Sequence, residues 1–459
     1  MSDDEADSGR RRAMLEPEQV RDVLRRGLAA SKADLTEVLF IEHSTALTRY
    51  SNSVIHQNVA EDDLTVSVRV INEGRTGSAR TNKIDPASLE ETVRKATVFA
   101  DASPADPNFR DLPSPREEYP ERQGRYESTA LFGPDDRAAY VREVIDRARR
   151  EGMAAAGTIS ASALTVGVAN SNGVEAIDDM TEAQMGAVVT GPDSTGFAEG
   201  LAPDVRSIDA KAIGEVATAK AKDSAGPRDV EPGRWTVILE PSAVADMLGF
   251  LAYVGFGAKA YQEKRSFMTG KIGQRIMGEN VTIYDDGLDA RAMSLGFDFE
   301  GVPKQKVMLV EGGVARGVVY DSYTAALDST CSTGHALPAP NTHGPLATNI
   351  FMVEGADTVE NLIASTERGI LVTRFHYTNI EHPIKTTLTG LTRDGTFLIE
   401  AGKIAGGVRN LRFTQSVIEA LNNVTGITSE RRLSETMLGA YYVPTLRIDG
   451  FNFTGATEY

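Results

Sequence analysis

Residues 235–276 read WTVILEPSAVADMLGFLAYVGFGAKAYQEKRSFMTGKIGQRI. The apolar run Val237-Ile238-Leu239 is soon followed by Pro241-Ser242, a pattern typical of a strand that ends where a helix begins. Apolar residues then recur at helical spacing, which predicts a helix over 242–260 with one buried face. Glycine and alanine are frequent toward its end, so we expect another segment of backbone to approach this helix closely.

The remainder of the second half is richer in strands than in helices. Strands dominate and helices do not alternate strictly with them, so we expect an α+β fold rather than a doubly wound parallel sheet. The polar run 223–228 indicates a domain boundary, which gives an N-terminal domain over 15–225 and a C-terminal, strand-rich mixed domain over 230–459. The predicted strands of the second domain are 280–284, 305–311, 314–320, 347–353, 369–375, 396–400 and 408–413, with helices at 242–260, 357–367 and 415–424.

The first half of the chain shows one order of elements twice, helix then strand meander then helix. Residues 1–14 are polar and charged, which predicts a disordered N-terminus. A proline-rich connector at about 102–134 separates the two copies. The first copy comprises a helix at 17–32, strands at 38–49, 53–59, 64–70 and 75–81, and a helix from Asp85; the second comprises a helix at 135–151, strands at 157–168 and 174–189, and a helix at 208–222.

Composition limits the function classes. The 459 residues carry a formal net charge of −17 at pH 7, and such an acidic chain repels nucleic acid and anionic membranes. A single cysteine fits a reducing compartment. No run approaches the ~18 apolar residues of a membrane span, and the acidic start MSDDEADSG does not resemble a secretion signal. We therefore expect a cytoplasmic protein with no nucleic-acid or membrane partner.

Short motifs along the chain add a resemblance whose order is more specific than any single motif. In this order the sequence resembles the TldD/PmbA family, in which PmbA is also called TldE. The motifs are Ser266-Phe267-Met268-Thr269-Gly270-Lys271-Ile272-Gly273, Tyr284-Asp285-Asp286-Gly287, Asp298-Phe299-Glu300-Gly301-Val302-Pro303, Glu311-Gly312-Gly313, Ser332-Thr333-Gly334-His335, Ile399-Glu400-Ala401-Gly402-Lys403-Ile404 and Pro444-Thr445-Leu446-Arg447-Ile448-Asp449.

The resemblance implies a zinc motif that this chain lacks. Catalytic TldD-type members carry HExxxH on the helix quoted above, with two zinc-binding histidines and a glutamate base. Counted back from Ser266, the histidine positions hold Gly249 and Val254, and the glutamate position holds Phe250. These side chains can neither bind zinc nor act as a base. The cysteine that the catalytic members carry near the carboxyl end is missing too, so the resemblance predicts no catalytic residue and no metal ligand in this chain.

The resemblance therefore implies a TldE-like subunit that forms a heterodimer with a TldD-like catalytic subunit. Zinc is expected in that partner, and this chain is expected to hold no cofactor. The complex would admit unfolded or modified peptides to a closed chamber and cleave them on the TldD side. The chain would contribute chamber wall and bind extended peptides along strand edges.

Two alternatives remain open at the sequence level. The only cysteine and four of the six histidines fall in one part of the second half, so Cys331, His335, His376 and His382 could form a relocated metal site in a self-contained metallopeptidase. Their spacings match no known zinc pattern. The second alternative is a stand-alone, non-enzymatic modulator protein.

The acidic group Asp285, Asp286, Asp298 and Glu300 could bind a divalent cation, although carboxylates that only form turns and helix caps are far commoner.

Overall fold

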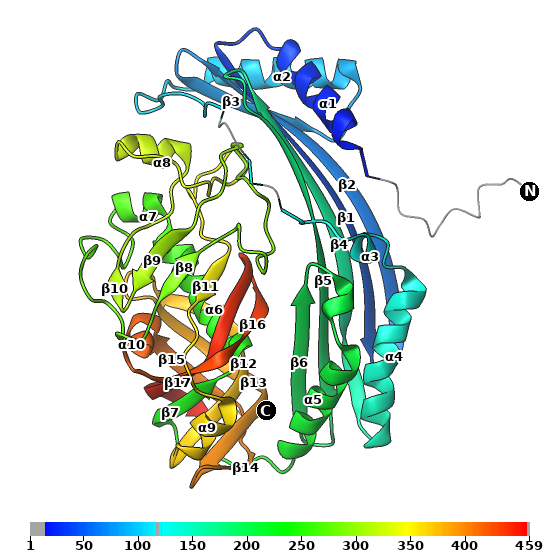
Figure 1. Ribbon diagram of the computed structural model, residues 1–459, viewed down its shortest axis with the longest axis vertical. Coiled ribbons are helices and arrows are strands. Elements are labelled where there is room, and N and C mark those ends of the chain that lie inside the picture. Colours follow the sequence, from blue (N-terminus) through cyan, green and yellow to red (C-terminus); the bar gives the residue numbers. More distant parts are fainter. Residues whose placement is uncertain (1–13, 116–118, 121, 457–459) are drawn as a thin grey trace, which may run out of the picture.

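The computed structural model describes residues 14–115, 119–120 and 122–456, so the expected disorder at 1–14 lies almost wholly outside the described residues. Figure 1 shows a sheet of long curved strands beside a strand-rich second half. The elements up to residue 223 are α1 (Pro17–Ala29), β1 (Leu35–Ser51), β2 (Val54–Asn72), β3 (Arg75–Thr81), α2 (Pro86–Ala102), α3 (Glu127–Ala130), α4 (Pro134–Arg150), β4 (Ala154–Asn170), β5 (Glu175–Thr190), β6 (Thr195–Ala202), η2 (Val205–Ser207) and α5 (Ala210–Asp223).

The expected repeat of element order is confirmed. One helix, three antiparallel strands and one helix occur as α1-β1-β2-β3-α2 and again as α4-β4-β5-β6-α5. The six strands form a single sheet in the order β3-β2-β1-β4-β5-β6, so the two copies join through antiparallel pairing of β1 with β4. The expected strands at 53–59 and 64–70 are one strand, β2, because the ladder with β1 continues through the charged residues between them. The glycine-containing strand β6 was not predicted.

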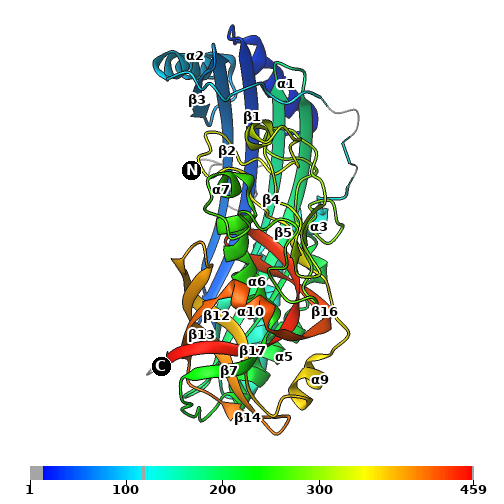
Figure 2. The same cartoon turned by 90° about the vertical axis from the view of Figure 1, so that its left-hand side faces the viewer.

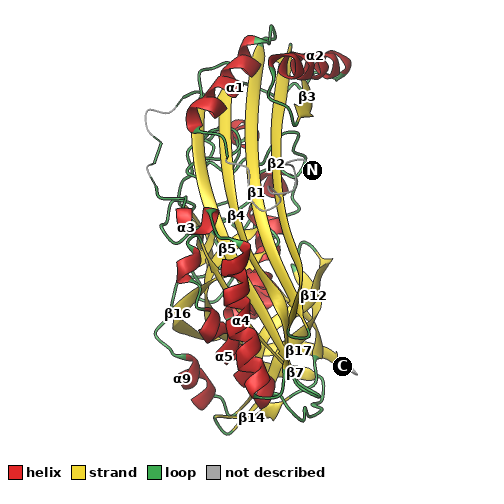
Figure 3. Cartoon of the chain, turned by 90° about the vertical axis from the view of Figure 1, so that its right-hand side faces the viewer, coloured by secondary structure: helices red, strands yellow, loops and turns green. Residues whose placement is uncertain are grey.

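The two faces of this sheet differ. Figure 3 shows α1, α2, α4 and α5 all lying on one face. Apolar residues of the strands pack beneath these helices in two clusters, one around Val38, Phe40 and Val66 and one around Ile159 and Met185. The other face, called the inner face here, is turned away from α1, α2, α4 and α5 and toward the second half of the chain (Figure 1).

The second half centres on a closed strand barrel. Its elements are β7 (Gly233–Leu239), α6 (Pro241–Leu251), η3 (Ala252–Phe256), α7 (Ala258–Gln262), β8 (Ile283–Asp285), β9 (Val307–Glu311), β10 (Val314–Ala315), α8 (Ser322–Leu327), β11 (Ile350–Met352), α9 (Val359–Ala364), β12 (Arg368–His382), β13 (Thr387–Glu400), β14 (Lys403–Gly407), β15 (Leu411–Ser416), α10 (Val417–Asn422), β16 (Val424–Thr436) and β17 (Gly439–Ala456).

The barrel closes because β17 pairs with both β15 and β7. The ring runs β7-β12-β13-β15-β17, and the β7–β12 pairing is parallel. Phe375, Phe413 and Phe451 pack against one another inside it, with ring centroids 4.4 to 6.0 Å apart. Figure 2, which looks at the second half from the front, shows this barrel low in the molecule and the long strands behind it.

The α+β expectation is confirmed, with corrections at the carboxyl end and around the central helix. Strands β16 and β17 were not predicted, although β17 holds the ring together. The expected strand at 314–320 shrinks to the two residues of β10. None of the described helices is long and apolar enough to cross a membrane.

Candidate functional site

The expected helix over 242–260 is three segments rather than one. The α-helix α6 passes into a π-helical turn, η3, and Gly257 then adopts an extended conformation before α7 begins. Gly257 is required there, because a Cβ atom at this position would lie 2.3 Å from the carbonyl oxygen of Pro345. This close approach of backbone explains one of the small residues in the sequence.

The π turn bears on the five-residue spacing of HExxxH. In an α-helix, residues i and i+5 point about 140° apart, whereas a π turn brings residues at this spacing onto one face. The turn Ala252–Phe256 overlaps the end of the hexad 249–254. Gly249 lies in the α-helical part and Val254 in the turn, and neither of these two histidine positions offers a donor atom for zinc.

The three hexad positions are packed into the core. Phe250 and Val254 are only 6% and 8% exposed and belong to the main apolar cluster of the second half. A Cβ atom on Gly249 would meet the side chain of Thr436 at 3.5 Å, an ordinary contact. Between them, Tyr253 is 41% exposed and stacks on His343 with ring centroids 4.9 Å apart. Apart from Tyr253, this segment is apolar and enclosed.

The inner face of the long sheet carries polar side chains opposite the helix. Cross-strand neighbours Thr45, Ser162 and Glu182 form one row, and Leu47, Ser160 and Gln184 form the next. All of these side chains are partly buried. A packed apolar core would not place hydroxyl, amide and carboxylate groups in adjacent rows, so this surface is built as a polar wall.

Direct contacts join this wall to the second half. Ser242 at the start of α6 donates a hydrogen bond of 2.6 Å to Glu199 of β6. Gln184 of β5 donates to Glu435 of β16. The guanidinium of Arg374 lies 4.0 Å from the ring centre of Phe197.

Carboxylates at this junction have raised pKa values. Burial, with a smaller contribution from the nearby Glu435 carboxylate, raises the pKa of Glu182 to about 7. Burial raises the pKa of Asp246 on α6 to about 6, against a smaller opposing effect of Thr378. The pKa of Glu199 is also raised, again chiefly by burial. One signal in the sequence could have pointed to Glu182 and Gln184, because they occupy alternating polar positions in a strand with one buried face.

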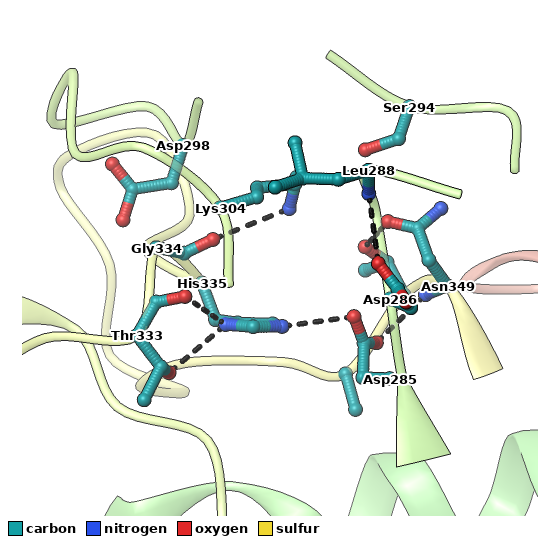
Figure 4. Close-up of polar contacts among 12 residues, drawn as sticks. Asp285, Asp286, Leu288, Ser294, Asp298, Lys304, Thr333, Gly334, His335 and Asn349 are labelled. Carbon is teal, nitrogen blue, oxygen red and sulfur yellow. Dashed lines mark hydrogen bonds and ion pairs between the residues drawn. The ribbon is translucent and has the colours of Figure 1, made fainter. Parts of the chain in front are cut away.

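Three of the resemblance motifs converge on a second cluster, shown in Figure 4. Asp285 Oδ1 lies 2.9 Å from His335 Nε2, and its Oδ2 accepts the Asn349 N–H at 2.8 Å. His335 Nδ1 lies 2.9 Å from both the hydroxyl and the carbonyl oxygen of Thr333. Both the Asp285 and His335 side chains are 0% exposed. An aspartate, a histidine and a threonine that contact one another in series resemble the arrangement used in nucleophilic catalysis. This group is buried, however, and no substrate could reach it without unfolding of the protein.

Asp298 and Lys304 complete this cluster. The Asp298 carboxylate accepts backbone N–H groups from Glu300, Val302 and Ala336 at 2.9 to 3.0 Å. Burial, together with repulsion by Glu300, nevertheless holds its pKa well above the usual range. Lys304 donates to the Gly334 carbonyl at 3.3 Å. Burial lowers the pKa of Lys304, against the opposing effect of Asp285 and Asp298.

The pKa of Asp285 shows how the cluster balances its charges. Burial alone would raise it, but His335, Lys304 and the Asn349 N–H together outweigh burial and lower it. Asp285 and Asp298, two of the four acidic residues considered for a divalent cation, thus accept hydrogen bonds from groups of the protein itself. Glu300 accepts the Ser322 N–H and pairs with Arg69 of β2, which ties the sheet to the second half.

The residues of the relocated metal site are dispersed. His335 lies in the buried cluster, whereas Cys331 is exposed. His376 and His382 lie on β12, but two register shifts between them break the regular alternation that would place them on one face. Within the described residues, no group of three or more His, Cys, Asp or Glu side chains is arranged to hold a metal ion.

Comparison with protein families matches most of the chain. The model of the PmbA/TldA metallopeptidase C-terminal domain matches residues 232–455, and that of PmbA/TldA metallopeptidase domain 1 matches residues 36–98. An uncharacterized protein of Methanocaldococcus jannaschii is 28% identical over 307 residues, which cover 66% of this chain and 70% of that protein. A metalloprotease TldD homolog of Haemophilus influenzae is 30% identical over 175 residues, which cover 38% of this chain and 36% of the homolog.

Among solved structures, the chain is similar to TldE from Thermococcus kodakarensis, with a TM-score of 0.87 and 21% identity. The match covers 95% of this chain and 100% of the Thermococcus kodakarensis chain. At this level of identity the likeness establishes a shared fold, and the activity has to be argued from the residues.

Proposed function

This chain belongs to the TldD/PmbA metallopeptidase family, and we propose that it is a TldE-like, non-catalytic subunit of a TldD/TldE-type zinc peptidase complex that acts on unfolded or modified peptides. One observation carries the proposal. The segment where catalytic members place HExxxH has a π turn but presents Gly249, Phe250 and Val254, with the last two buried in apolar surroundings. Restoring a metal site there would require replacing core side chains.

The partner's zinc would supply an activated water and polarise the scissile carbonyl. The residues of this chain supply the surroundings. The polar wall formed by Thr45, Ser160, Ser162, Glu182 and Gln184 offers hydrogen-bond donors and acceptors to an extended backbone without selecting its side chains. Such a wall suits a chamber for peptides of varied sequence. The single cysteine and acidic charge keep the cytoplasm as the proposed compartment.

Of the two alternatives, the self-contained metallopeptidase has less support. His335 is buried, Cys331 is exposed, and two register shifts separate His376 from His382 on β12. The stand-alone modulator makes a distinct prediction, since it would need no partner for its role.

The test uses the full chain, purified without a histidine tag, and a TldD-like subunit from the same source. We expect no cleavage of unfolded peptides by this chain alone, and cleavage when the two subunits are mixed. The two subunits should also co-purify, because the proposal requires that they form a complex before they cleave peptides. Cleavage by this chain alone, sensitive to a zinc chelator, would overturn the proposal, as would a TldD-like subunit whose activity is the same with and without this chain.

A further inference from the structure

One edge of the long sheet is open over much of its length. Strand β2 pairs with β1 from Val54 to Ile71, whereas β3 pairs with β2 only from Val66 to Asn72. Among the described residues, no strand lies beside 54–65 on the side away from β1. In an antiparallel sheet, alternate backbone N–H and C=O groups of an edge strand point outward. This open segment spans about 40 Å.

Most side chains of the same segment are exposed, although Ile55 packs against the apolar cluster beneath α4. From Val54 to Asp63 the side chains are exposed at all but two positions, whichever face they are on. From Leu64 onward the strand alternates between buried and partly buried residues. Figure 3 shows α1 and α2 at the end of the sheet far from the start of β2. Among the described residues, the ladder with β1 is the strand pairing of 54–65.

The chemistry of such an edge selects its occupant. Unpaired backbone groups in a row are complementary to an extended chain, not to a helix or a small molecule. A single bound peptide would pair with the edge but leave both faces of 54–63 in water. A folded chain that continues the sheet would cover the edge and the faces together. Val54, 58% exposed, would be buried by such a chain.

We infer that the open edge of β2, residues 54–65, is the surface at which the TldD-like partner subunit joins this chain, by adding a strand to the sheet. The inference rests on the proposed function for the existence of the partner. Glu61 and Asp63 are exposed near one end of this edge. The strand that pairs there bears basic or neutral residues opposite them, because like charges on facing strands are unfavourable.

An edge can also be acidic simply to prevent aggregation. The two roles differ in what reversal of the charges does. If the carboxylates only keep edges apart, Glu61→Lys with Asp63→Lys aggregates or leaves the monomer unchanged and does not affect partner binding. If the edge is the interface, the same double variant weakens the complex.

Hydrogen–deuterium exchange of the full chain, alone and with the TldD-like subunit, tests the inference directly. We expect backbone amides of 54–65 to gain protection on complex formation. The double variant Glu61→Lys/Asp63→Lys should weaken binding at least tenfold at low salt and keep its circular dichroism. The matched control is Glu90→Lys/Asp101→Lys, the same charge change at exposed positions of α2, which should bind like wild type.

Each other outcome has a definite meaning. A complex that forms with no protection at 54–65, or with equal affinity for both double variants, overturns the inference and leaves the proposed function standing. Protection that depends on the concentration of this chain alone assigns the edge to a second copy and overturns it. Protection by an unfolded peptide alone assigns the edge to substrate and likewise overturns it. Failure of the wild-type chain to bind any TldD-like subunit removes the proposed function itself.

Discussion

Asp285 Oδ1 and His335 Nε2 lie 2.9 Å apart in a region that water does not reach. Asp285 is the last residue of β8, and His335 ends the Ser-Thr-Gly-His segment. One contact therefore joins two motifs that are far apart in sequence. Because Asp298 and Lys304 flank the same segment, three of the motifs by which the family is recognised here form a buried scaffold. Their role in this chain is to hold the loops above the barrel in place.

Replacing Asp285 by Asn should lower the free energy of unfolding by about 3 kcal/mol, because it breaks the buried pair with His335 and removes one of the two carboxylates that favour a charged Lys304. The native pKa of Asp285 is lowered, so its contribution is present above the unfolded pKa and is lost as pH falls through the folded value. The difference between wild type and variant should therefore narrow in acid. Urea unfolding at several pH values measures this, with the exposed Glu311→Gln as control. Equal stability at pH 7 would contradict a scaffold role.

Glu182→Gln should have the opposite pH dependence. The folded pKa is raised from 4.5 to about 7, so the native state holds a proton that the unfolded state releases between these values. Stability of the wild type should fall as pH rises through this window and level off above it. The variant lacks this loss and should be more stable than wild type at pH 8 by on the order of 2–3 kcal/mol, with no difference at pH 4. Parallel curves for both proteins would show that Glu182 titrates normally.

Two glycines near the hexad should respond differently to alanine. Gly249→Ala adds a Cβ atom in ordinary contact with Thr436, so the change in stability should stay within about 0.5 kcal/mol. Gly257→Ala places the same atom 2.3 Å from the Pro345 carbonyl oxygen and should cost about 2 kcal/mol or more. Thermal unfolding of both variants compares them in one experiment. A well-tolerated Gly257→Ala would mean that the loop carrying Pro345 moves easily.

Elemental mass spectrometry of the untagged chain should find far less than one zinc per molecule. Gly249, Phe250 and Val254 provide no ligand, and Cys331, His335, His376 and His382 are apart. Near-stoichiometric zinc would refute the TldE-like role and direct mutation to His376 and His382. The dimeric complex with a TldD-like subunit serves as the positive control, since its metal content should equal that of the partner.

The sequence predicted most elements because periodicity is local. The repeat, the outer helices and most strands follow from apolar spacing that a single segment contains. The errors concern relations between segments. Nothing within 53–70 tells that β1 would pair across Glu61 and Asp63, and nothing within Thr436–Gly439 tells that two strands meet there. The two-domain division at 223–228 stays a prediction.

For the site, the missing zinc residues were readable from the sequence, but their surroundings were not. Glu182, Glu199 and Asp246 acquire their raised pKa values from burial by elements distant in sequence. A metal site that uses His376 and His382 would need a regular strand to place both on one face, and the register shifts of β12 interrupt that regularity. Such irregularities depend on the neighbouring strand as much as on the residues themselves.

The pairing of β17 with β7 has a consequence for how the cell makes this protein. Strand β7 leaves the ribosome early in the second half, but its neighbour β17 follows every other described strand in chain order. The nascent chain can pair β7 with β12 before β17 is made, but the ring stays open until β17 is present, whereas every strand of the long sheet is already available. A chain cut short before residue 439 therefore lacks the strand that closes the ring, and the apolar residues that pack against β17 stay exposed to water.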